Sequence, residues 1–320
     1  MRILVTGAAG FIGSHLTESL VAAGHQVVGV DNFNDHLYPS SVKRKNAAIV
    51  AKSVEIHEVD IADPAGIERH MQGIDVVCHL AALAGVRPSL EQPMAYIQTN
   101  LHGLNVVLEA MRQQKTDRLV FASSSSVYGS RPGLESAKPF REDDPCHEQS
   151  SLYAMTKRAG ELMASTYRNL HGIGVSCLRF FTVYGPRQRQ DMAIHKFAAA
   201  IVNNNPIRLF GDGTSRRDYT YIDDIVRATK TACERVEPNG FNIYNLGGTK
   251  TTSLASLVEK LEVVLEQKAI VEKHPIQPGD VPLTFADITN SSRDLDYAPT
   301  VELEAGLEKF CRWYRSEFLA

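Results

Sequence analysis

The chain has 320 residues, of which 43% are hydrophobic and 22% are charged, and its formal net charge is −3. This length and apolar content are enough for one large domain or two smaller domains with a sizeable core. The balanced charge argues against a nucleic-acid partner, and the lack of a long apolar stretch argues against a membrane protein.

The first 31 residues predict a strand, a glycine-rich turn, a helix and a second strand. Ile3–Val5 and Gln26–Val30 are short apolar runs of the kind found in buried strands, and the second run ends at Asp31. An amphipathic pattern between them indicates a helix that ends near Gly24. Three glycines with GxxGxxG spacing precede this helix: Gly7, Gly10 and Gly13.

This order of elements is typical of a dinucleotide site, although the usual fingerprint is GxGxxG. Glycines let the backbone approach a pyrophosphate, and the N–H groups and dipole at a helix start favour an anion. An acid at the end of the second strand can bind a ribose diol, and it would repel a 2′-phosphate. Asp31 therefore predicts NAD rather than NADP. Without further signals, the same pattern would also fit a tight turn that binds nothing.

Strands and helices are expected to alternate as far as Phe181. This alternation predicts an α/β fold in which a parallel sheet carries helices on both faces, the Rossmann-type doubly wound arrangement. The expected strands are 54–59, 75–80, 118–122 and 172–181, and the expected helices are 63–71, 93–112 and 151–171.

The pattern becomes irregular and rich in turns after Tyr184. We expect a smaller C-terminal substrate-binding lobe there, with one segment that returns to the main sheet. Substrate is expected in the cleft between the two parts, beyond the strand ends. The predicted division is 1–183 with 221–247 for the NAD-binding domain, and 184–220 with 248–320 for the lobe.

Tyr153 and Lys157 share one face of a predicted helix because they stand four residues apart. A lysine ammonium beside the phenol would favour phenolate and lower the pKa of the tyrosine. Ser123–Ser126 follows a predicted strand, and a serine at that place can hydrogen-bond a substrate hydroxyl. Each signal alone fits a solvated helix pair or a polar turn. Together with the glycine loop they predict an active site.

The five cysteines, Cys78, Cys146, Cys177, Cys233 and Cys311, are far apart and odd in number. Without a CxxC pair or a Cys/His cluster, they predict free thiols and no metal site. Reduced thiols are typical of cytoplasmic proteins. The apolar start of the chain fits a strand better than an export signal, so we expect a cytoplasmic protein.

The sequence resembles the extended short-chain dehydrogenases/reductases of the nucleotide-sugar epimerase and dehydratase group over nearly its whole length. The motifs TGAAGFIG, HLAA, SSSSVYG, YxxxK and GDGTSRRDYTYIDD carry the resemblance. It implies that Ser124, Tyr153 and Lys157 act on a sugar 4-hydroxyl, and that Arg217 and Asp280 hold the nucleotide part of the substrate. The residues it implies for NAD binding are Gly7, Gly10, Phe11, Ile12, Gly13, Asp31, Asn32, Asp60, Ile61, Ala81, Ala82, Asn100, Tyr153 and Lys157.

In this group Tyr153 as phenolate would remove the 4-hydroxyl proton while hydride passes from C4 to NAD⁺. Subgroups that then dehydrate or decarboxylate typically carry acids just after the catalytic Ser/Thr. Here those positions are Ser125 and Ser126, which cannot take a proton at neutral pH. The simplest outcome is rotation of the keto sugar and return of hydride to its other face, which is 4-epimerisation. Because the cofactor is regenerated in place, we expect tightly bound NAD.

The stretch Leu178–Met192 resembles the UDP-glucuronate 4-epimerases, although Gln190 stands where that family usually has proline. Hydroxyls of Ser125, Ser126 and Thr182 would hold the glucuronate carboxylate. By similarity Arg189 reaches the nucleotide end of this UDP-sugar. Arg87 is expected either near the sugar or in a loop as an ordinary arginine without a binding role.

Several alternatives stay open at this point. Thr284 is small enough to admit an N-acetyl group, so a 4-epimerase of UDP-glucose or of a UDP-N-acetylhexosamine is one of them. Gln277, where galactose epimerases usually have arginine, weakens the first of these. A UDP-glucuronate decarboxylase and a non-catalytic nucleotide-sensing scaffold are further alternatives. The helices 93–112 and 151–171 resemble those that form four-helix bundles in family dimers, which predicts a homodimer, but their apolar residues also fit packing on the sheet alone.

Overall fold

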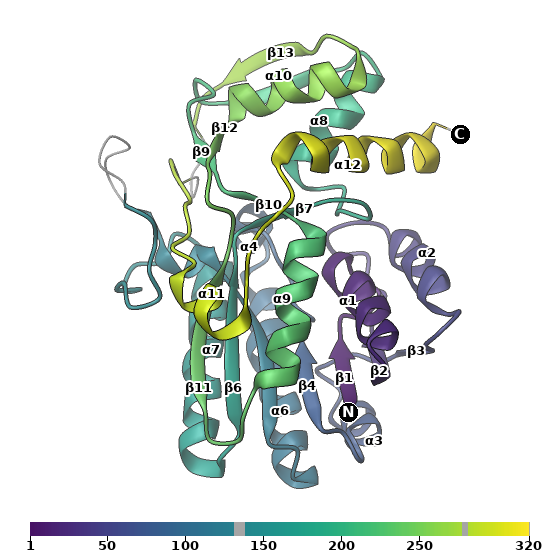
Figure 1. Cartoon of the computed structure of the whole chain (residues 1–320), viewed down its shortest axis with the longest axis vertical. Helices are drawn as coiled ribbons and strands as arrows, with labels where there is room; N and C mark the ends of the chain where they lie inside the picture. The colour runs from purple at the N-terminus through teal and green to yellow at the C-terminus, as the bar shows by residue number, and fades with distance from the viewer. Residues whose placement is uncertain (131–137, 277–280, 320) are drawn as a thin grey trace.

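The computed structural model describes residues 1–130, 138–276 and 281–319, and a seven-stranded parallel sheet forms its centre (Figure 1). The strand order is β11-β6-β5-β4-β1-β2-β3, so the chain leaves β1 in one direction and then crosses back to β4. This order confirms the predicted Rossmann-type α/β fold. The strands are β1 (Arg2–Thr6), β2 (Gln26–Asp31), β3 (Ile56–Glu58), β4 (Val76–His79), β5 (Arg118–Ser124), β6 (Gly174–Phe180) and β11 (Phe241–Leu246).

Helices cover both faces of this sheet. On one face α1 (Phe11–Ala22) lies beside α9 (Ile222–Arg235), while the other face carries α3 (Pro64–Met71), α6 (Gly103–Gln114) and α7 (Leu152–His171) (Figure 1). The alternation of side chains along each strand separates two apolar layers. Ile3 and Val5 pack in the layer under α1 and α9, whereas Leu4 packs in the opposite layer. Burial on both faces explains why the strands are continuous apolar runs.

The segment from Pro93 to Arg112 is not the single regular α-helix that the sequence predicts. It divides into α5 (Pro93–Tyr96), the π-helix η1 (Ile97–His102) and the start of α6. Asn100 lies in the π-helical part. Its side-chain amide accepts a hydrogen bond from the N–H of Leu83 and donates one to the Leu83 carbonyl. Periodicity could not predict this insertion, because the contact joins the helix to a distant loop.

A smaller lobe covers the carboxyl ends of the strands (Figure 1). Its apolar side chains on α8, α10 and α12 belong to the same core cluster as those under α1 and α9. The two parts therefore share a continuous core. The lobe contains the helices α8 (Ala193–Val202), α10 (Leu254–Leu265) and α12 (Leu303–Phe318) and the strand pairs β7 (Thr182–Tyr184) with β10 (Tyr219–Tyr221), β8 (Pro206–Phe210) with β13 (Ile270–His274), and β9 (Arg216–Arg217) with β12 (Thr252–Ser253).

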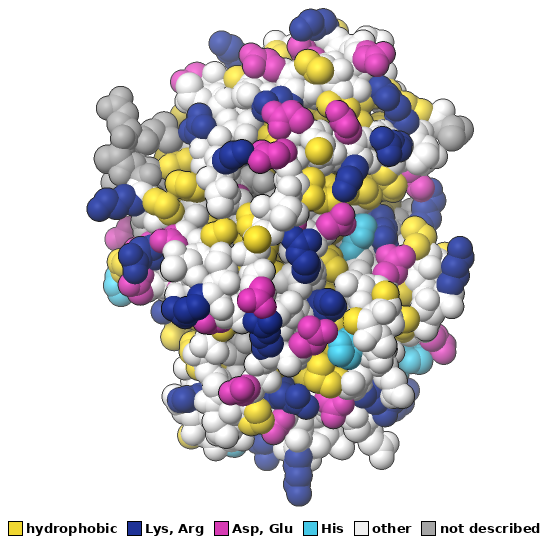
Figure 2. Space-filling model, in the orientation of Figure 1, with side chains coloured by type: hydrophobic (Ala, Val, Ile, Leu, Met, Phe, Trp, Pro, Cys, Tyr) yellow, Lys and Arg dark blue, Asp and Glu magenta, His cyan; other side chains and the backbone are white. Residues whose placement is uncertain are grey.

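The remaining elements are short or peripheral: α2 (Ser40–Val50), α4 (Val86–Glu91), the 3-10 helix η2 (Ser125–Tyr128) and α11 (Thr289–Leu295). All five cysteines are free thiols, as predicted. No helix in the described part of the chain is long and apolar enough to cross a membrane. Basic and acidic side chains are interspersed over the face shown in Figure 2, without a large patch of one sign.

Candidate active site

A cavity of about 440 Å³ opens at the carboxyl ends of the central strands. Its wall includes the glycine loop, the ends of β2 and β5, the loop after β4, the start of α7 and the segment that precedes α8. Most of the predicted site residues meet there. They are Gly7, Gly10, Phe11, Ile12, Gly13, Asp31, Asn32, Ile61, Ala81, Ala82, Ser124, Ser126, Tyr153, Lys157 and Arg189.

The glycine loop is packed so closely that side chains are excluded. Gly7 has a φ of +71°, and a Cβ atom on it would lie 2.9 Å from the backbone nitrogen of Ala81. A Cβ atom on Gly13 would lie 2.1 Å from the carbonyl oxygen of Gly7. Helix α1 begins directly after Gly10 without a side-chain cap and without an acid in its first turn. Its first N–H groups therefore face the cavity side of the loop as donors for an anion, which fits the pyrophosphate of NAD.

Asp31 ends β2 with its carboxylate in the cavity wall. The carboxylate accepts hydrogen bonds from the N–H groups of Ala9 (3.2 Å) and Phe33 (2.9 Å). The Nζ atom of Lys43 lies 3.7 Å from its Oδ1 atom, and both side chains are buried. Sequence reasoning missed Lys43, although it shares the buried face of α2 with Asn46 and Val50 at helical spacing. A lysine on the same helix face as buried residues was the feature of the sequence that could have identified it.

The three predicted catalytic residues come together on α7 and at the end of β5. Helix α7 begins at a serine cap, because the Ser151 hydroxyl accepts the N–H of Ala154 at 3.1 Å. The Tyr153 phenol lies beside Ser124, whose hydroxyl favours the phenolate and donates a 3.1 Å hydrogen bond to the Ser126 hydroxyl. One turn further along, Lys157 donates a 2.7 Å hydrogen bond to the carbonyl of Ala122.

The expected effect of Lys157 on Tyr153 is corrected by the structure. Burial raises the pKa of the Tyr153 phenol above its usual value, and the hydrogen bond with Ser124 and the charge of Arg189 oppose this rise. Burial also lowers the pKa of Lys157 to about 7. Removal from water, and not attraction between the two side chains, is the largest cause of the pKa shift of each group.

Arg189 and Asp191 form a bidentate ion pair in the cavity wall. The Nε atom of Arg189 lies 2.9 Å from Oδ1 of Asp191, and Nη2 lies 2.7 Å from Oδ2. Asp191 was not among the predicted site residues, although it stands within the motif that contains Arg189. Tyr38 and Met192 also contribute to the wall without having been predicted.

Some predicted NAD-binding residues lie behind the wall. Asp60 accepts hydrogen bonds from the Asn32 amide and from the N–H of Ala62, both at 2.8 Å. The amide of Asn100 is used by Leu83 and by Thr156, whose hydroxyl it contacts at 3.0 Å. Both residues therefore support neighbours that reach the cavity region.

The predicted substrate residues are more scattered. Ser125, Thr182, Arg87 and Arg217 are not part of the wall, and Thr284 is also outside it. The guanidinium of Arg87 lies 4.6 Å from the centre of the Phe210 ring. Asp280 and Gln277 lie outside the described residues.

Comparison with known proteins gives the family of the chain. A family model described as "NAD dependent epimerase/dehydratase family" matches residues 3–247. The chain is 40% identical to a UDP-glucuronate 4-epimerase of Thermodesulfobacterium geofontis, over 97% of the chain and 95% of that relative.

Two solved structures are similar over nearly the whole chain. One is the UDP-glucuronic acid 4-epimerase of Bacillus cereus in complex with UDP-glucuronic acid and NAD, with a TM-score of 0.93, 36% identity and coverage of 99% of this chain and 100% of that one. The other is the UDP-glucose 4-epimerase of Thermus thermophilus in complex with NAD, with a TM-score of 0.89, 31% identity and coverage of 99% and 100%. The chain belongs to the NAD-dependent epimerase/dehydratase family, and its cofactor is NAD.

Proposed function

We propose that this chain is a nucleotide-sugar 4-epimerase that interconverts UDP-glucuronate and UDP-galacturonate. The observation that carries the proposal is the composition of the cavity wall around Ser124 and Tyr153. Among the described residues of the wall, the acids are Asp31 and Asp191, and each is held in an ion pair. No acid among the described residues of the wall is thus free to remove a proton from C5, while the two hydroxyls for C4 chemistry line the same cavity.

The proposed reaction uses Tyr153 as the base for the sugar 4-hydroxyl. Ser124 lies beside the phenol and would hold the same sugar hydroxyl. Bound NAD⁺ supplies the hydride acceptor for C4 and later the hydride donor. Lys157 anchors α7 to β5 through the Ala122 carbonyl and so keeps Tyr153 beside Ser124.

The cofactor would lie along the glycine loop, with its ribose at Asp31. The uncapped start of α1 and the closely packed glycines support this orientation. Asp60 and Asn100 would act by holding Asn32 and Leu83, which are parts of the wall. We propose that NAD stays bound through many turnovers, because epimerisation regenerates it in place.

The glucuronate carboxylate would be held by neutral donors near the end of β5. Ser126 is part of the cavity wall, and we assign Ser125 and Thr182 to the same role. A 4-keto uronic acid is a β-keto acid that loses CO₂ readily. Neutral hydroxyls fix the carboxylate without offering an acid to the developing enolate, which favours epimerisation over decarboxylation. Arg189, Arg217 and Asp280 are assigned to the nucleotide end of the substrate.

The test is a panel of UDP-sugars incubated with purified protein and followed by NMR. UDP-glucuronate should yield UDP-galacturonate without added NAD and without a UDP-pentose. Release of CO₂ with a UDP-pentose product would show a decarboxylase instead. Turnover of UDP-glucose or a UDP-N-acetylhexosamine, with none of UDP-glucuronate, would move the proposal to the neutral-sugar epimerases.

We also propose a homodimer formed through α6 and α7. Leu162 and Leu170 are large apolar side chains on α7 that are 55% and 70% exposed. A second copy packed against this helix would bury them. Light scattering should give the mass of a dimer, and Leu162→Glu should shift it toward the monomer. A wild-type protein that is monomeric at micromolar concentration would contradict this part.

A further inference from the structure

A row of polar contacts on successive turns fastens α7 to the end of β5. Tyr153 lies beside Ser124, Lys157 donates to the carbonyl of Ala122 at 2.7 Å, and Glu161 accepts a 2.6 Å hydrogen bond from the Ser123 hydroxyl. The spacing of four residues places all three side chains on one helix face. Ser123 lines the cavity together with the residues of the first two contacts, whereas Glu161 does not.

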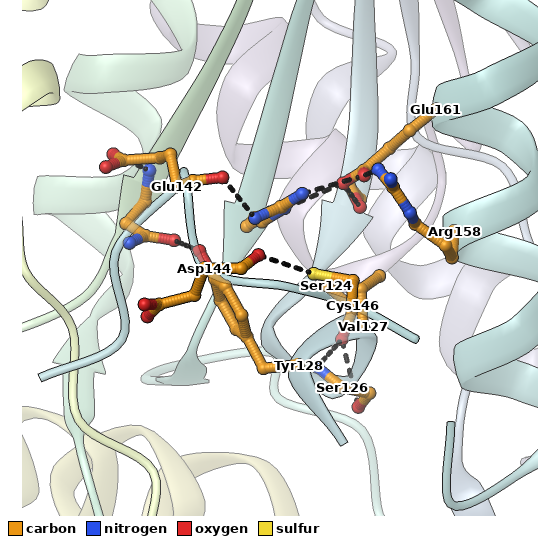
Figure 3. Close-up of polar contacts among 12 residues, drawn as sticks. Ser124, Ser126, Val127, Tyr128, Glu142, Asp144, Cys146, Arg158 and Glu161 are labelled. Carbon is orange, nitrogen blue, oxygen red and sulfur yellow. Dashed lines mark hydrogen bonds and ion pairs between the residues drawn. The ribbon is translucent and has the colours of Figure 1, made fainter. Parts of the chain in front are cut away.

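Glu161 is held in place by two arginines. Arg179 donates from Nε to Oε1 at 2.8 Å and from Nη2 to Oε2 at 2.9 Å, and Arg158 donates to Oε2 at 2.8 Å. The side chains of Glu161 and Arg179 are each only 1% exposed. Figure 3 shows Glu161 and Arg158 in this network, close to the Ser124–Tyr128 segment.

The Glu161 carboxylate is charged and fully hydrogen-bonded. Burial by itself would raise its pKa, but the hydrogen bonds and charge of Arg179, together with Ser123 and Arg158, hold the pKa below its usual value. Each carboxylate oxygen accepts two hydrogen bonds, so the group has little freedom to rotate. A buried pair of this kind adds little net stability, yet it strongly favours one geometry over others.

Arg179 extends the same restraint to the serine-rich turn. It lies on β6 directly beside Ser123 in the sheet register. Its guanidinium lies 4.7 Å from the centre of the Tyr128 ring, and the Tyr128 hydroxyl donates a 2.6 Å hydrogen bond to Asn245 of β11. The Arg179 guanidinium therefore contacts both the helix that carries Tyr153 and the turn that follows Ser124.

We propose that Glu161, held by Arg179, is a positioning residue that sets the rotation of α7 against β5 and thereby places the Tyr153 phenol beside Ser124. This inference rests on the proposed role of Tyr153 as base. Glu161 does not reach the cavity, so it acts only through the elements it joins. A shift of about 1 Å in a reacting group can cost about 100-fold in rate, which makes such a restraint visible in kcat.

The test is a series of variants in the full-length protein, measured on the UDP-sugar that the wild type converts. Glu161→Ala removes every contact and should lower kcat by about 10- to 100-fold with KM changed less than about twofold. Glu161→Gln keeps an oxygen for the Ser123 hydroxyl and should recover part of that loss. Bound NAD should remain near one per chain in both variants, because the cofactor residues are untouched.

Ser123→Ala is the second variant, and it decides the matter if Glu161→Ala does not fold. It removes the link to β5 but leaves the Glu161–Arg179–Arg158 ion pairs intact. We expect kcat to fall several-fold, about 3- to 10-fold, with an unchanged KM.

Asp224→Asn is the matched control for loss of a buried carboxylate. Asp224 on α9 is 1% exposed, pairs with Arg227 three residues later and accepts the N–H groups of Thr300 and Val301. It does not contribute to the cavity wall. This variant should lower Tm while kcat stays at the wild-type value below the transition.

Two results would overturn the inference. One is a wild-type kcat in folded Glu161→Ala or in Ser123→Ala. The other is an equal loss of kcat in Asp224→Asn, which would show that general destabilisation explains the effect. A wild-type protein that converts no sugar of the panel would instead overturn the proposed function, so the two failures are distinguishable.

Discussion

Lys157 donates a 2.7 Å hydrogen bond to the carbonyl oxygen of Ala122, and this contact ties the second turn of α7 to the last residues of β5. Burial lowers the pKa of Lys157 to about 7, because removal from water disfavours the charged ammonium form. The contact of the lysine with β5 therefore fixes the position of the helix turn next to Tyr153.

The first prediction concerns this lysine. Lys157→Met keeps the apolar stem but cannot donate to Ala122, and we expect kcat to fall by at least about 100-fold. Circular dichroism should show a folded protein with native helix content. Retention of more than about a tenth of the wild-type kcat would contradict a role for Lys157 in catalysis.

The second prediction separates catalysis from cofactor binding. Tyr153→Phe removes only the phenol oxygen, so turnover should fall by at least about 1,000-fold because the base is lost. NAD released by denaturation and measured by chromatography should stay at the wild-type amount. An unchanged rate would remove Tyr153 from the mechanism, and a protein that loses its NAD would assign the residue chiefly to cofactor binding.

The third prediction concerns the choice between NAD and NADP. Asp31→Asn removes the charge that would face a 2′-phosphate, while its amide oxygen can still accept from Ala9 or Phe33. We expect NAD to bind about 10-fold more weakly and the preference for NAD over NADP to shrink by at least about 10-fold. Cofactor titration of stripped protein measures both values.

Asp60→Asn is the control for this experiment. Asp60 is exposed, accepts a hydrogen bond from Asn32 and does not line the cavity. Its substitution should change the preference by less than about twofold. If Asp60→Asn matched Asp31→Asn, long-range charge and not the Asp31 carboxylate would explain the selectivity.

The fourth prediction concerns the pH dependence of stability at Asp218. Burial raises the pKa of this carboxyl to about 6, although the N–H groups of Gly248 and Ala286 and the Thr220 hydroxyl favour the charged form. Since the folded chain holds the proton more tightly than the unfolded chain, the contribution of Asp218 to stability is lost as pH rises from about 4 to 6.

The measurement compares wild type with Asp218→Asn by denaturant unfolding between pH 4 and 7.5. Relative to the variant, the wild type should lose about 3 kcal/mol of unfolding free energy up to pH 6, from two pH units at about 1.4 kcal/mol each, and then level off. A difference that does not vary with pH would show that Asp218 is charged throughout this range.

Much of the cofactor site could be predicted because its signals are local. The run from Ile3 to Asp31 contains its own strand, turn and helix periodicities, and the close packing at Gly13 is against its near neighbour Gly7, although Gly7 itself packs against the distant Ala81. Tyr153 and Lys157 share a face through helix geometry alone. These features follow from backbone periodicity, which does not depend on the rest of the chain.

Contacts between distant segments could not be predicted in the same way. Glu161 meets Ser123 and Arg179 because the sheet places β5 and β6 side by side under α7, and Asn100 meets Leu83 because the chain folds back between β4 and α6. Helical spacing identified the face of α7 but not its partners. The π-helical turn at Asn100 was missed for the same reason.

The residue types and their spacing were thus enough to predict the doubly wound fold, which the structure confirms, and to propose the glycine loop and the Ser124–Tyr153–Lys157 group, which line one cavity. Packing decided the protonation behaviour of that group, since burial raises the pKa of Tyr153 and lowers that of Lys157. Packing also decided which charges meet in the cavity, where Lys43 faces Asp31 and Arg189 faces Asp191. The physical reason is that desolvation and ion pairing depend on three-dimensional distance, whereas periodicity records only position along the chain.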